Sequence, residues 1–235
     1  MAGLTVLALL VIAGFVKEIG RMPARAQAAA LTATTRSAAP ASSPRPAPKP
    51  SPSARAAVGP QITDASSGLS YQLLSSPWQQ GCPGLLDTPM FSWTAGEHAV
   101  AGPADVGGTV IDWHANACSG QLNQDFAYSG PADLEPVAMG VADATDPAFY
   151  AGLSHSRTLQ DSSATQISGH PAWVVRFLMT YPDAAAEGLA WTSEAAAVVV
   201  VDRGTGQAPA VFYASVPANL GTGTVATLIN SLRLA

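Results

Sequence analysis

The stretch AAAVVVVDRGTGQAPAVFYASVP, residues 195–217, decides the fold. Two nearly continuous apolar runs, 195–201 and 209–217, flank a glycine-containing segment, which predicts a β-hairpin with its turn at 202–206. A strand that is apolar at successive positions carries apolar side chains on both faces of its sheet. We therefore expect a sheet that is covered on both faces by helices or a second layer.

Five other segments are predicted to be strands because they are short, apolar or alternating, and bounded by turn-forming residues. They are LSYQLLSS (69–76), MFSWTAGEHAVAG (90–102), GTVIDWHANACSG (108–120), TLQDSSATQI (158–167) and AWVVRFLMTY (172–181). The second of them alternates most clearly, so Phe91, Trp93 and Ala95 are expected to point to one face of the sheet.

Two helices are expected between and after these strands. Apolar residues at helical spacing predict a helix over residues 133–144, capped by Asp133 and followed by a break in DATDP, residues 143–147. A second apolar stripe, formed by Val225, Leu228, Ile229 and Leu232, predicts a closing helix. The order strands, helix, strands, helix indicates an α+β domain with an antiparallel sheet flanked by helices.

Charge divides the chain into two parts. The first 60 residues hold seven Lys and Arg against one acid, and the remaining 175 hold four Arg, no Lys and fifteen acids. The second part has a net charge of 4 − 15 = −11, which repels phosphate backbones and anionic lipid surfaces. Nucleic acid is therefore excluded as an expected partner, and phosphorylated small molecules are disfavoured.

The N-terminal part has the composition of a membrane anchor and a spacer. Residues 1–16, MAGLTVLALLVIAGFV, are apolar without interruption, and we expect residues 1–20 to form a single transmembrane helix that is not cleaved. Residues 21–65 are rich in Ala, Ser and Pro and predict an extended, disordered linker. Residues 66–235 are then expected to fold outside the cytoplasm, attached to the cell membrane.

Cys82 and Cys118 are the only cysteines of the chain. An even pair in an exported domain is typical of a disulfide. The alternative is a metal site formed by Asp112, His114 and Cys118, but their spacing matches no zinc signature. No cofactor and no metal ion are expected.

The hairpin at 195–217, the closing segment GTVATLINSLRL (223–234) and the upstream GHPAWVVRF (169–177) together resemble the PsbP-like fold. More narrowly, they resemble actinobacterial envelope proteins, including lipoproteins of the LpqN kind. The resemblance implies a central antiparallel sheet between helices, an α/β/α sandwich used in binding and accessory roles. It supplies no catalytic motif. This chain differs from the lipoprotein members because its first 60 residues lack a cysteine for lipid attachment.

Two groups of residues are candidates for a functional site. In the predicted strand 108–120, Asp112 and His114 share a face opposite Trp113 and Ala115, and that face is either a polar site or a solvated surface.

The second group contains the acids Asp183, Glu187 and Glu194 around Trp191, which is the composition of a glycoside hydrolase site if two carboxylates converge. Glu194 enters an apolar run and is the acid expected to be partly buried. The string 152–156, GLSHS, lacks the last glycine of a nucleophile elbow.

The leading hypothesis is a membrane-anchored, monomeric, extracytoplasmic binding or accessory module without catalytic activity, whose partner is an envelope protein or a glycan. The alternative is an envelope hydrolase acting on polysaccharide or ester substrates. A sensor that relays a signal across the membrane is a third reading, and it requires a cytoplasmic domain.

Overall fold

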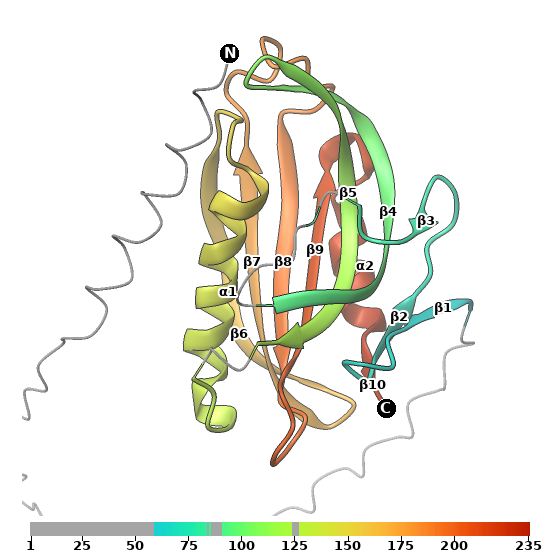
Figure 1. The fold of residues 1–235 in the computed structure, drawn as a ribbon, viewed down its shortest axis with the longest axis vertical. Helices are drawn as coiled ribbons and strands as arrows, with labels where there is room; N and C mark the ends of the chain where they lie inside the picture. Colours follow the sequence, from blue (N-terminus) through green and yellow to red (C-terminus); the bar gives the residue numbers. More distant parts are fainter. Residues whose placement is uncertain (1–58, 84, 86–90, 124–126) are drawn as a thin grey trace, which may run out of the picture. The chain divides into compact units, whose positions relative to one another are not determined.

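Figure 1 shows the computed structural model, which describes residues 59–83, 85, 91–123 and 127–235. The expected transmembrane anchor, residues 1–20, and the expected linker as far as residue 58 lie outside the described residues. Within the described ranges, no helix is long and apolar enough to cross a membrane.

Seven strands form one antiparallel sheet in the order β3-β4-β5-β9-β8-β7-β6. They are β3 (Gln79–Gln80), β4 (Phe91–Val106), β5 (Thr109–Leu122), β6 (Ser156–Ile167), β7 (His170–Thr180), β8 (Ser193–Val201) and β9 (Ala210–Pro217). The predicted hairpin at 195–217 is confirmed as β8 and β9, which pair from Glu194↔Pro217 to Val201↔Ala210. These strands lie inside the sheet, and every residue of β9 is buried.

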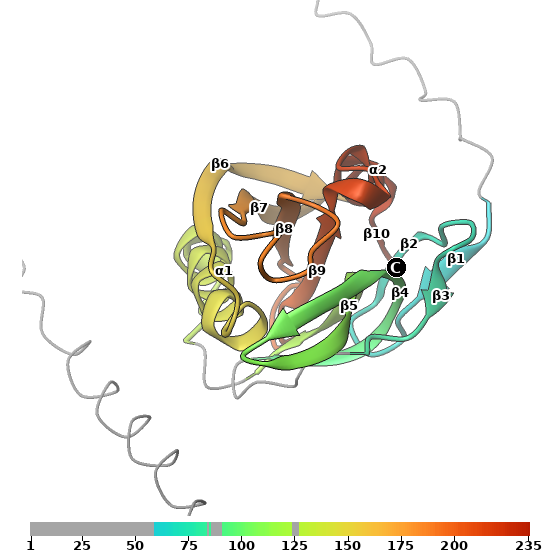
Figure 2. The ribbon, with the colours of Figure 1, turned by 90° about the horizontal axis from the view of Figure 1, so that it is seen from above.

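Two helices cover the two faces of this sheet. Helix α1 (Leu134–Phe149) packs on one face with the core around Val141, Val198 and Tyr213. Helix α2 (Gly223–Ser231) packs on the opposite face with the core around Leu228, Val199 and Phe212. Figure 2 shows the sheet between the two helices. The predicted α+β domain with a helix-flanked antiparallel sheet is thus confirmed, because the alternate residues of β8 and β9 enter two separate cores.

A second, three-stranded sheet extends the α2 face. It consists of β1 (Gln61–Thr63), β2 (Leu69–Gln72) and β10 (Arg233–Leu234), in the order β1-β2-β10. The prediction that the linker extends to residue 65 is wrong at its end, because Ile62 is buried in the α2-side core and pairs with Tyr71. The predicted strand at 69–76 ends earlier, at Gln72.

The hairpin of β4 and β5 contains two register shifts, between Trp93 and Ala95 and between Val100 and Gly102. The first is why the expected common face of Phe91, Trp93 and Ala95 is wrong. Phe91 and Trp93 pack in the α1-side core, whereas Ala95 packs in the α2-side core. An extra residue in one strand reverses the facing of all that follow it.

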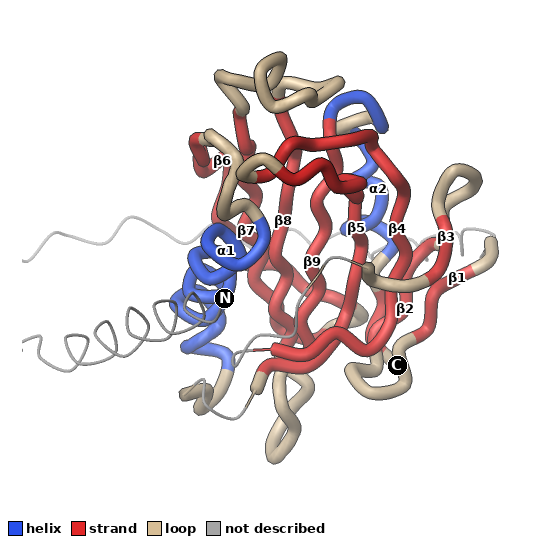
Figure 3. The backbone as a smooth tube through the Cα atoms, turned by 45° about the horizontal axis from the view of Figure 1, so that its top comes forward, coloured by secondary structure: helices blue, strands red, loops and turns tan. Residues whose placement is uncertain are grey.

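Beyond the second shift, the end of this hairpin bends across the sheet towards α1 (Figure 3). Ala104 and Val106 join the α1-side core, and Asp105 donates a backbone hydrogen bond to Glu187. The bend also moves Trp113 into the α1-side core while Ala115 stays in the α2-side core, so their predicted common face is wrong.

Helix α1 differs from its prediction at both ends. Asp133 precedes the helix, but its side chain makes no capping bond and instead accepts a hydrogen bond from the Ser129 amide. The helix continues past the expected break to Phe149, because Pro147 lies in the last turn and removes only its own N–H donor. Tyr150 and Leu153, which follow the helix, are buried.

Gly96 lies where β4, β5 and the Cys82–Cys118 disulfide pack closely together. A β-carbon at Gly96 would lie 2.7 Å from Cys118 Sγ and 2.6 Å from the Ala117 carbonyl oxygen, and it would also overlap Cys82 Sγ. We expect Gly96→Ala to lower the free energy of unfolding by about 1–3 kcal/mol through overpacking. Gly223→Ala is the control, because a β-carbon there meets no atom within 4 Å. Equal urea midpoints for the two variants would contradict this packing.

Candidate functional site

Glu194 is the most unusual polar residue of the α1-side core. It lies at the start of β8, and no part of it is exposed. Its Oε2 accepts hydrogen bonds from Trp113 Nε1 at 3.0 Å and from the Tyr181 hydroxyl at 3.1 Å. Its Oε1 accepts one from the Tyr150 hydroxyl at 3.0 Å. The expected partial burial of Glu194 is confirmed and exceeded.

Burial raises the pKa of Glu194, and hydrogen bonds from Ser215, Trp113, Tyr150 and Tyr181 oppose that rise without cancelling it. The carboxyl therefore holds its proton at a higher pH than an exposed glutamate does. Perturbed acids of this kind are found at functional sites, although buried structural networks contain them as well.

Tyrosines connect Glu194 to α1 and β9. The Tyr150 hydroxyl lies 2.7 Å from the Tyr213 hydroxyl, and both side chains are fully buried. Burial raises the pKa of Tyr150, Tyr181 and Tyr213, and the charge of Glu194 raises each further. These hydroxyls remain protonated and serve as hydrogen-bond donors.

A cavity of about 110 Å³ adjoins this network. Strands β5, β8 and β9, the end of α1 and the segment before β4 all contribute to its lining. The lining residues are Pro83, Leu85, Ile111, Asp112, Trp113, His114, Asn116, Phe149, Tyr150, Glu194, Tyr213 and Ser215. Three of the four predicted candidates, Asp112, His114 and Glu194, are therefore brought together at one cavity.

Asp112 and His114 lie on the β5 side of this cavity. Asp112 is exposed, whereas His114 is half-buried with its ring 5.3 Å from that of His98. Burial lowers the pKa of His114 and the charge of His98 lowers it further, although Asp112 acts in the opposite direction. His114 is thus held in its neutral form near neutral pH.

Asn116 is the cavity residue whose hydrogen bonding is least complete. Its side chain is only 4 % exposed, and its Nδ2 donates to the His114 carbonyl at 3.0 Å. Its Oδ1 is buried and accepts no hydrogen bond from the described residues. An unsatisfied buried acceptor costs about 1–3 kcal/mol, so its presence beside a cavity requires an explanation.

Trp191, the fourth candidate, does not line the cavity. It is 3 % exposed and packs in the α1-side core, beside Gly102. The other candidate acids also lie elsewhere: Asp183 is exposed, and Glu187 Oε1 accepts a hydrogen bond from the Ser154 amide at 2.6 Å. All five tryptophans are buried or half-buried, so they form no exposed sugar-stacking groove.

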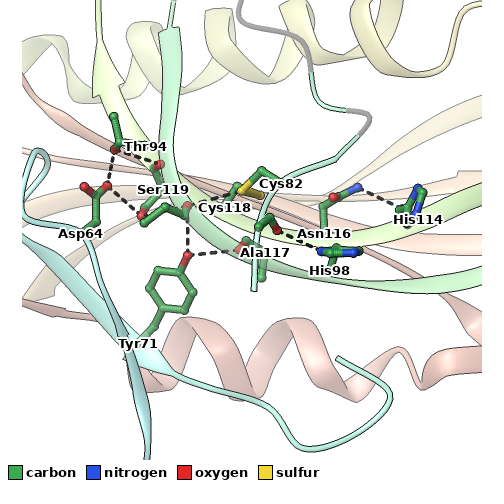
Figure 4. Close-up of a disulfide and its surroundings, with 12 residues drawn as sticks. Asp64, Tyr71, Cys82, Thr94, His98, His114, Asn116, Ala117, Cys118 and Ser119 are labelled. Atoms are coloured by element: carbon green, nitrogen blue, oxygen red, sulfur yellow. Dashed lines mark hydrogen bonds between the residues drawn. A yellow bond between two sulfur atoms is a disulfide. The ribbon is translucent and has the colours of Figure 1, made fainter. Parts of the chain in front are cut away.

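The predicted disulfide between Cys82 and Cys118 is confirmed, with Cα atoms 6.2 Å apart. It joins the segment before β4 to β5, as Figure 4 shows together with Asn116, His114 and His98. Cys82 precedes Pro83, which lines the cavity, and Cys118 lies two residues after Asn116. The disulfide therefore holds one wall of the cavity against β5.

The alternatives that would use metal or a catalytic serine receive no support from the geometry. Among the residues with assigned positions, no three His, Cys, Asp or Glu side chains are placed to hold a metal ion. His155 Nδ1 lies 2.8 Å from the Leu153 carbonyl oxygen, and its Nε2 lies 2.8 Å from Asp146 Oδ1, so both of its ring nitrogens already have partners. Neither of these partners is a serine hydroxyl, so the described residues of GLSHS show no Ser-His hydrogen bond.

A second buried carboxylate, Asp64, stabilises the small sheet (Figure 4). It accepts hydrogen bonds from the hydroxyls of Ser67 at 2.6 Å, Thr94 at 2.7 Å and Ser119 at 2.9 Å. Burial by itself raises the pKa of Asp64, but these hydrogen bonds together outweigh it, and the pKa lies below its usual value.

We expect Asp64→Asn to lower the free energy of unfolding by about 1–2 kcal/mol at neutral pH. A lowered pKa stabilises the fold above the unfolded pKa and ceases to do so as the pH falls through the folded pKa. The difference between wild type and variant should therefore narrow below about pH 4. Parallel stability curves from pH 7 to pH 2, measured by urea unfolding, would contradict this role.

Glu97 is a third buried acid, on the α2 face. Its Oε2 accepts a hydrogen bond from the Leu74 amide at 2.9 Å, and its Oε1 has no partner among the described residues. Burial raises the pKa of Glu97 to about 7, opposed by the Leu74 bond. It is not among the described residues that line the cavity beside Glu194.

Several cavity residues were not candidates in the sequence. Tyr213 and Ser215 alternate within β9, where their polar ends are conspicuous in an otherwise apolar run, and Asn116 continues the alternation of Asp112 and His114. The sequence pattern could therefore have identified Tyr213, Ser215 and Asn116 as candidates. Tyr150 could not be found in this way, because its position depends on how α1 ends over β9.

The comparisons with known proteins identify no family for this chain. No family model matches the chain, and no protein with a curated description matches it. Among solved structures, that of cyanobacterial PsbP from Synechocystis sp. PCC 6803 is similar with a TM-score of 0.41 and 12% sequence identity. The similarity covers 77% of this chain and 98% of that one. The α+β assignment itself follows from the seven-stranded antiparallel sheet and its two helices.

Proposed function

We propose that the chain is a membrane-anchored, extracytoplasmic binding or accessory module without catalytic activity, of the kind seen in LpqN-like envelope proteins. The apolar run at 1–16 and the Pro-rich segment after it support the anchor and the spacer. The Cys82–Cys118 disulfide supports an oxidising location, because such bonds persist mainly outside the cytoplasm.

The observation that carries the proposal is the cavity beside Glu194. Its polar groups come from strands β5, β8 and β9 and from Tyr150 at the end of α1, and they surround a space that is small and partly aromatic. Both oxygens of Glu194 are already bonded to aromatic side chains within the protein. Such a group orients its neighbours and shapes a binding site more readily than it transfers a proton to a substrate.

One observation favours the alternative, an envelope hydrolase acting on polysaccharide or ester substrates. Asp112 and Glu194 line the same cavity, one exposed and one buried with a raised pKa, which is the division of roles seen in glycoside hydrolysis. Asp183 and Glu187, the other acids near Trp191 in the sequence, are not among the described residues that line this cavity. In this alternative, Glu194 would be the acid and Asp112 the second carboxylate.

An activity screen separates the two proposals. The full-length protein is incubated with envelope polysaccharides and with p-nitrophenyl esters, and new reducing ends and nitrophenolate are measured. We expect no turnover above that of Asp112→Asn or Glu194→Gln. Turnover that either substitution abolishes, and that the control Glu187→Gln retains, would contradict the binding module and establish the hydrolase.

The location is tested separately. We expect a protease added outside intact cells, after removal of any outer wall layers, to cleave within the Pro-rich segment 40–60 and release the folded domain. Cleavage that occurs only after the membrane is opened would place the domain in the cytoplasm and refute this part of the proposal.

A further inference from the structure

We infer that the cavity beside Glu194 binds the ammonium group of a small organic cation that carries N–H donors. This inference rests on the proposal that the domain is a binding module, and it adds the chemical class of the ligand. It follows from three features of the lining: a buried hydrogen-bond acceptor that has no donor, the presence of acidic but not basic side chains among the described residues, and the aromatic side chains.

The acceptor is Asn116 Oδ1. Asn116 is 96 % buried, it lines the cavity, and its amide orientation is set by the bond from Nδ2 to the His114 carbonyl. Its Oδ1 therefore presents a lone pair that no described residue satisfies. A ligand that restores this hydrogen bond must bring a donor, and an N–H of an ammonium group is the strongest donor available to it.

The charges have one sign. Among the described residues, no Lys or Arg lines the cavity, whereas the carboxyl groups of Asp112 and Glu194 do. The other titratable groups of the lining are His114, Tyr150 and Tyr213. Each of them is neutral near pH 7, because burial lowers the pKa of the histidine and raises those of the tyrosines. An anion would meet two acids and no cation among these groups. An ammonium group would be attracted by the charge of Asp112, and the buried carboxyl of Glu194 would not repel it.

Beside Tyr150, next to the cavity, His155 and Asp146 form an ion pair. The ring of His155 lies 5.7 Å from that of Tyr150, tilted by 47°, and its Nε2 lies 2.8 Å from Asp146 Oδ1. Asp146 also raises the pKa of Tyr213 through its charge. This pair therefore brings no unbalanced positive charge towards the ligand.

The aromatic lining suits a cation. Trp113, Phe149, Tyr150 and Tyr213 all line the cavity, and the rings of Trp113 and Tyr150 lie 6.1 Å apart at 41°. The face of an aromatic ring attracts a cation within about 6 Å of its centre, and the attraction increases where water is excluded. Aromatic rings beside acids are the lining that recognises ammonium ligands, in contrast to the cationic lining that recognises phosphate or carboxylate.

The size limits the ligand. A closed apolar cavity of about 150 Å³ holds benzene, so a cavity of about 110 Å³ holds a smaller group. A short alkylammonium, or the amino end of a larger molecule that extends past the exposed Asp112 and Ile111, has suitable dimensions.

Titration of the full-length protein, labelled with ¹⁵N at tryptophan, tests the inference. The reporter is the indole N–H of Trp113, which is bonded to Glu194 and is assigned by its loss in Trp113→Phe. Three probes of matched chain length are compared: butylammonium, neutral 1-butanol and anionic butyrate. We expect a saturable shift with butylammonium, binding at least tenfold weaker with 1-butanol, and no shift with butyrate.

Two variants test the residues. Asn116→Leu should weaken butylammonium binding about tenfold, the loss typical of a hydrogen bond to a charged group. The exposed control Asn230→Leu, on α2, should leave it unchanged. Asp112→Asn should weaken binding about two- to fivefold, the range for an exposed charge pair. Because Asp112 is exposed, this variant remains informative even if Asn116→Leu does not fold.

Each outcome has a defined meaning. Binding of 1-butanol or butyrate as tight as that of butylammonium overturns the ammonium class and leaves the binding module standing. An unchanged affinity in both Asn116→Leu and Asp112→Asn also overturns it. If no probe shifts Trp113, the cavity is not the ligand site. The proposed function is refuted by different results: its non-catalytic part by turnover that depends on Asp112 or Glu194, and its location by the protease experiment.

Discussion

Glu194→Ala is expected to destabilise the domain by about 3 kcal/mol or more. The substitution removes the acceptor that Trp113 Nε1 and the hydroxyls of Tyr150 and Tyr181 share, and both tyrosines are buried. Each buried donor that loses its partner costs about 1–3 kcal/mol. The measurement is urea unfolding at pH 7, followed by tryptophan fluorescence.

Glu194→Gln is the matched control, because its amide oxygen still accepts hydrogen bonds and its volume is nearly the same. It should cost clearly less than alanine. If the two variants had equal midpoints, the hydrogen bonds to Glu194 would contribute nothing to stability, and the structural part of this account would be wrong.

The same variant alters the dependence of stability on pH. The folded pKa of Glu194 lies above its unfolded value, so its contribution to stability is fully present below the unfolded pKa of about 4.3 and is lost as the pH rises through the folded pKa. Glu97 acts in the same direction, with a folded pKa of about 7. Unfolding free energies measured from pH 5 to pH 8 should therefore decline in the wild type and decline less in Glu194→Gln and in Glu97→Gln.

Removal of the disulfide is expected to have an effect of similar size. Cys82 and Cys118 are 36 positions apart, and by the chain-entropy model a closed loop of that length is worth about 3–4 kcal/mol. The double variant Cys82→Ser, Cys118→Ser should lose that much stability relative to the oxidised wild type. In the reduced wild type the loss should be similar.

The disulfide also tests the architecture of the cavity. Because it holds the segment with Pro83 and Leu85 against β5, its loss should weaken butylammonium binding even in urea-free buffer, where the domain is still folded. Thiols that react freely with a maleimide in the native protein, without reductant, would show that the bond does not form and would remove a main support for an extracytoplasmic location.

The extent to which the sequence predicts this fold differs from one element to another. The hairpin of β8 and β9 was predictable because its signal is local: two apolar runs and a glycine turn specify the strands and their two-sided burial. Helices α1 and α2 were predictable for the same reason, since their apolar stripes repeat at helical spacing.

The bend of the β4–β5 hairpin was not predictable from alternation. The register shift after Trp93 depends on pairing with β5 and on the hydrogen bond from Thr94 to Asp64, thirty residues away. No local pattern contains that information. Strands β1 and β10, with three and two residues, are likewise too short to give a periodic signal and exist because they pair with β2.

For the candidate site, too, single residues could be predicted from the sequence but their arrangement could not. Asp112, His114 and Glu194 could be identified singly by residue type and by their position in apolar strands. That they share a cavity depends on the order β5-β9-β8, which places β9 with Tyr213 and Ser215 between them. Trp191 was a reasonable candidate next to Glu194 in sequence, but it precedes the strand and packs into the core beside the bent hairpin.

The central claim is that the cavity beside Glu194 holds a ligand without transforming it. The most direct measurement is the recovery of small molecules that copurify with the native full-length protein, compared by mass spectrometry with those from Asn116→Leu and from the control Asn230→Leu. The account predicts an amine-bearing molecule, recovered unaltered with the wild type and with Asn230→Leu and strongly depleted from Asn116→Leu. Equal recovery from all three proteins, or recovery only of a cleaved product, would contradict it.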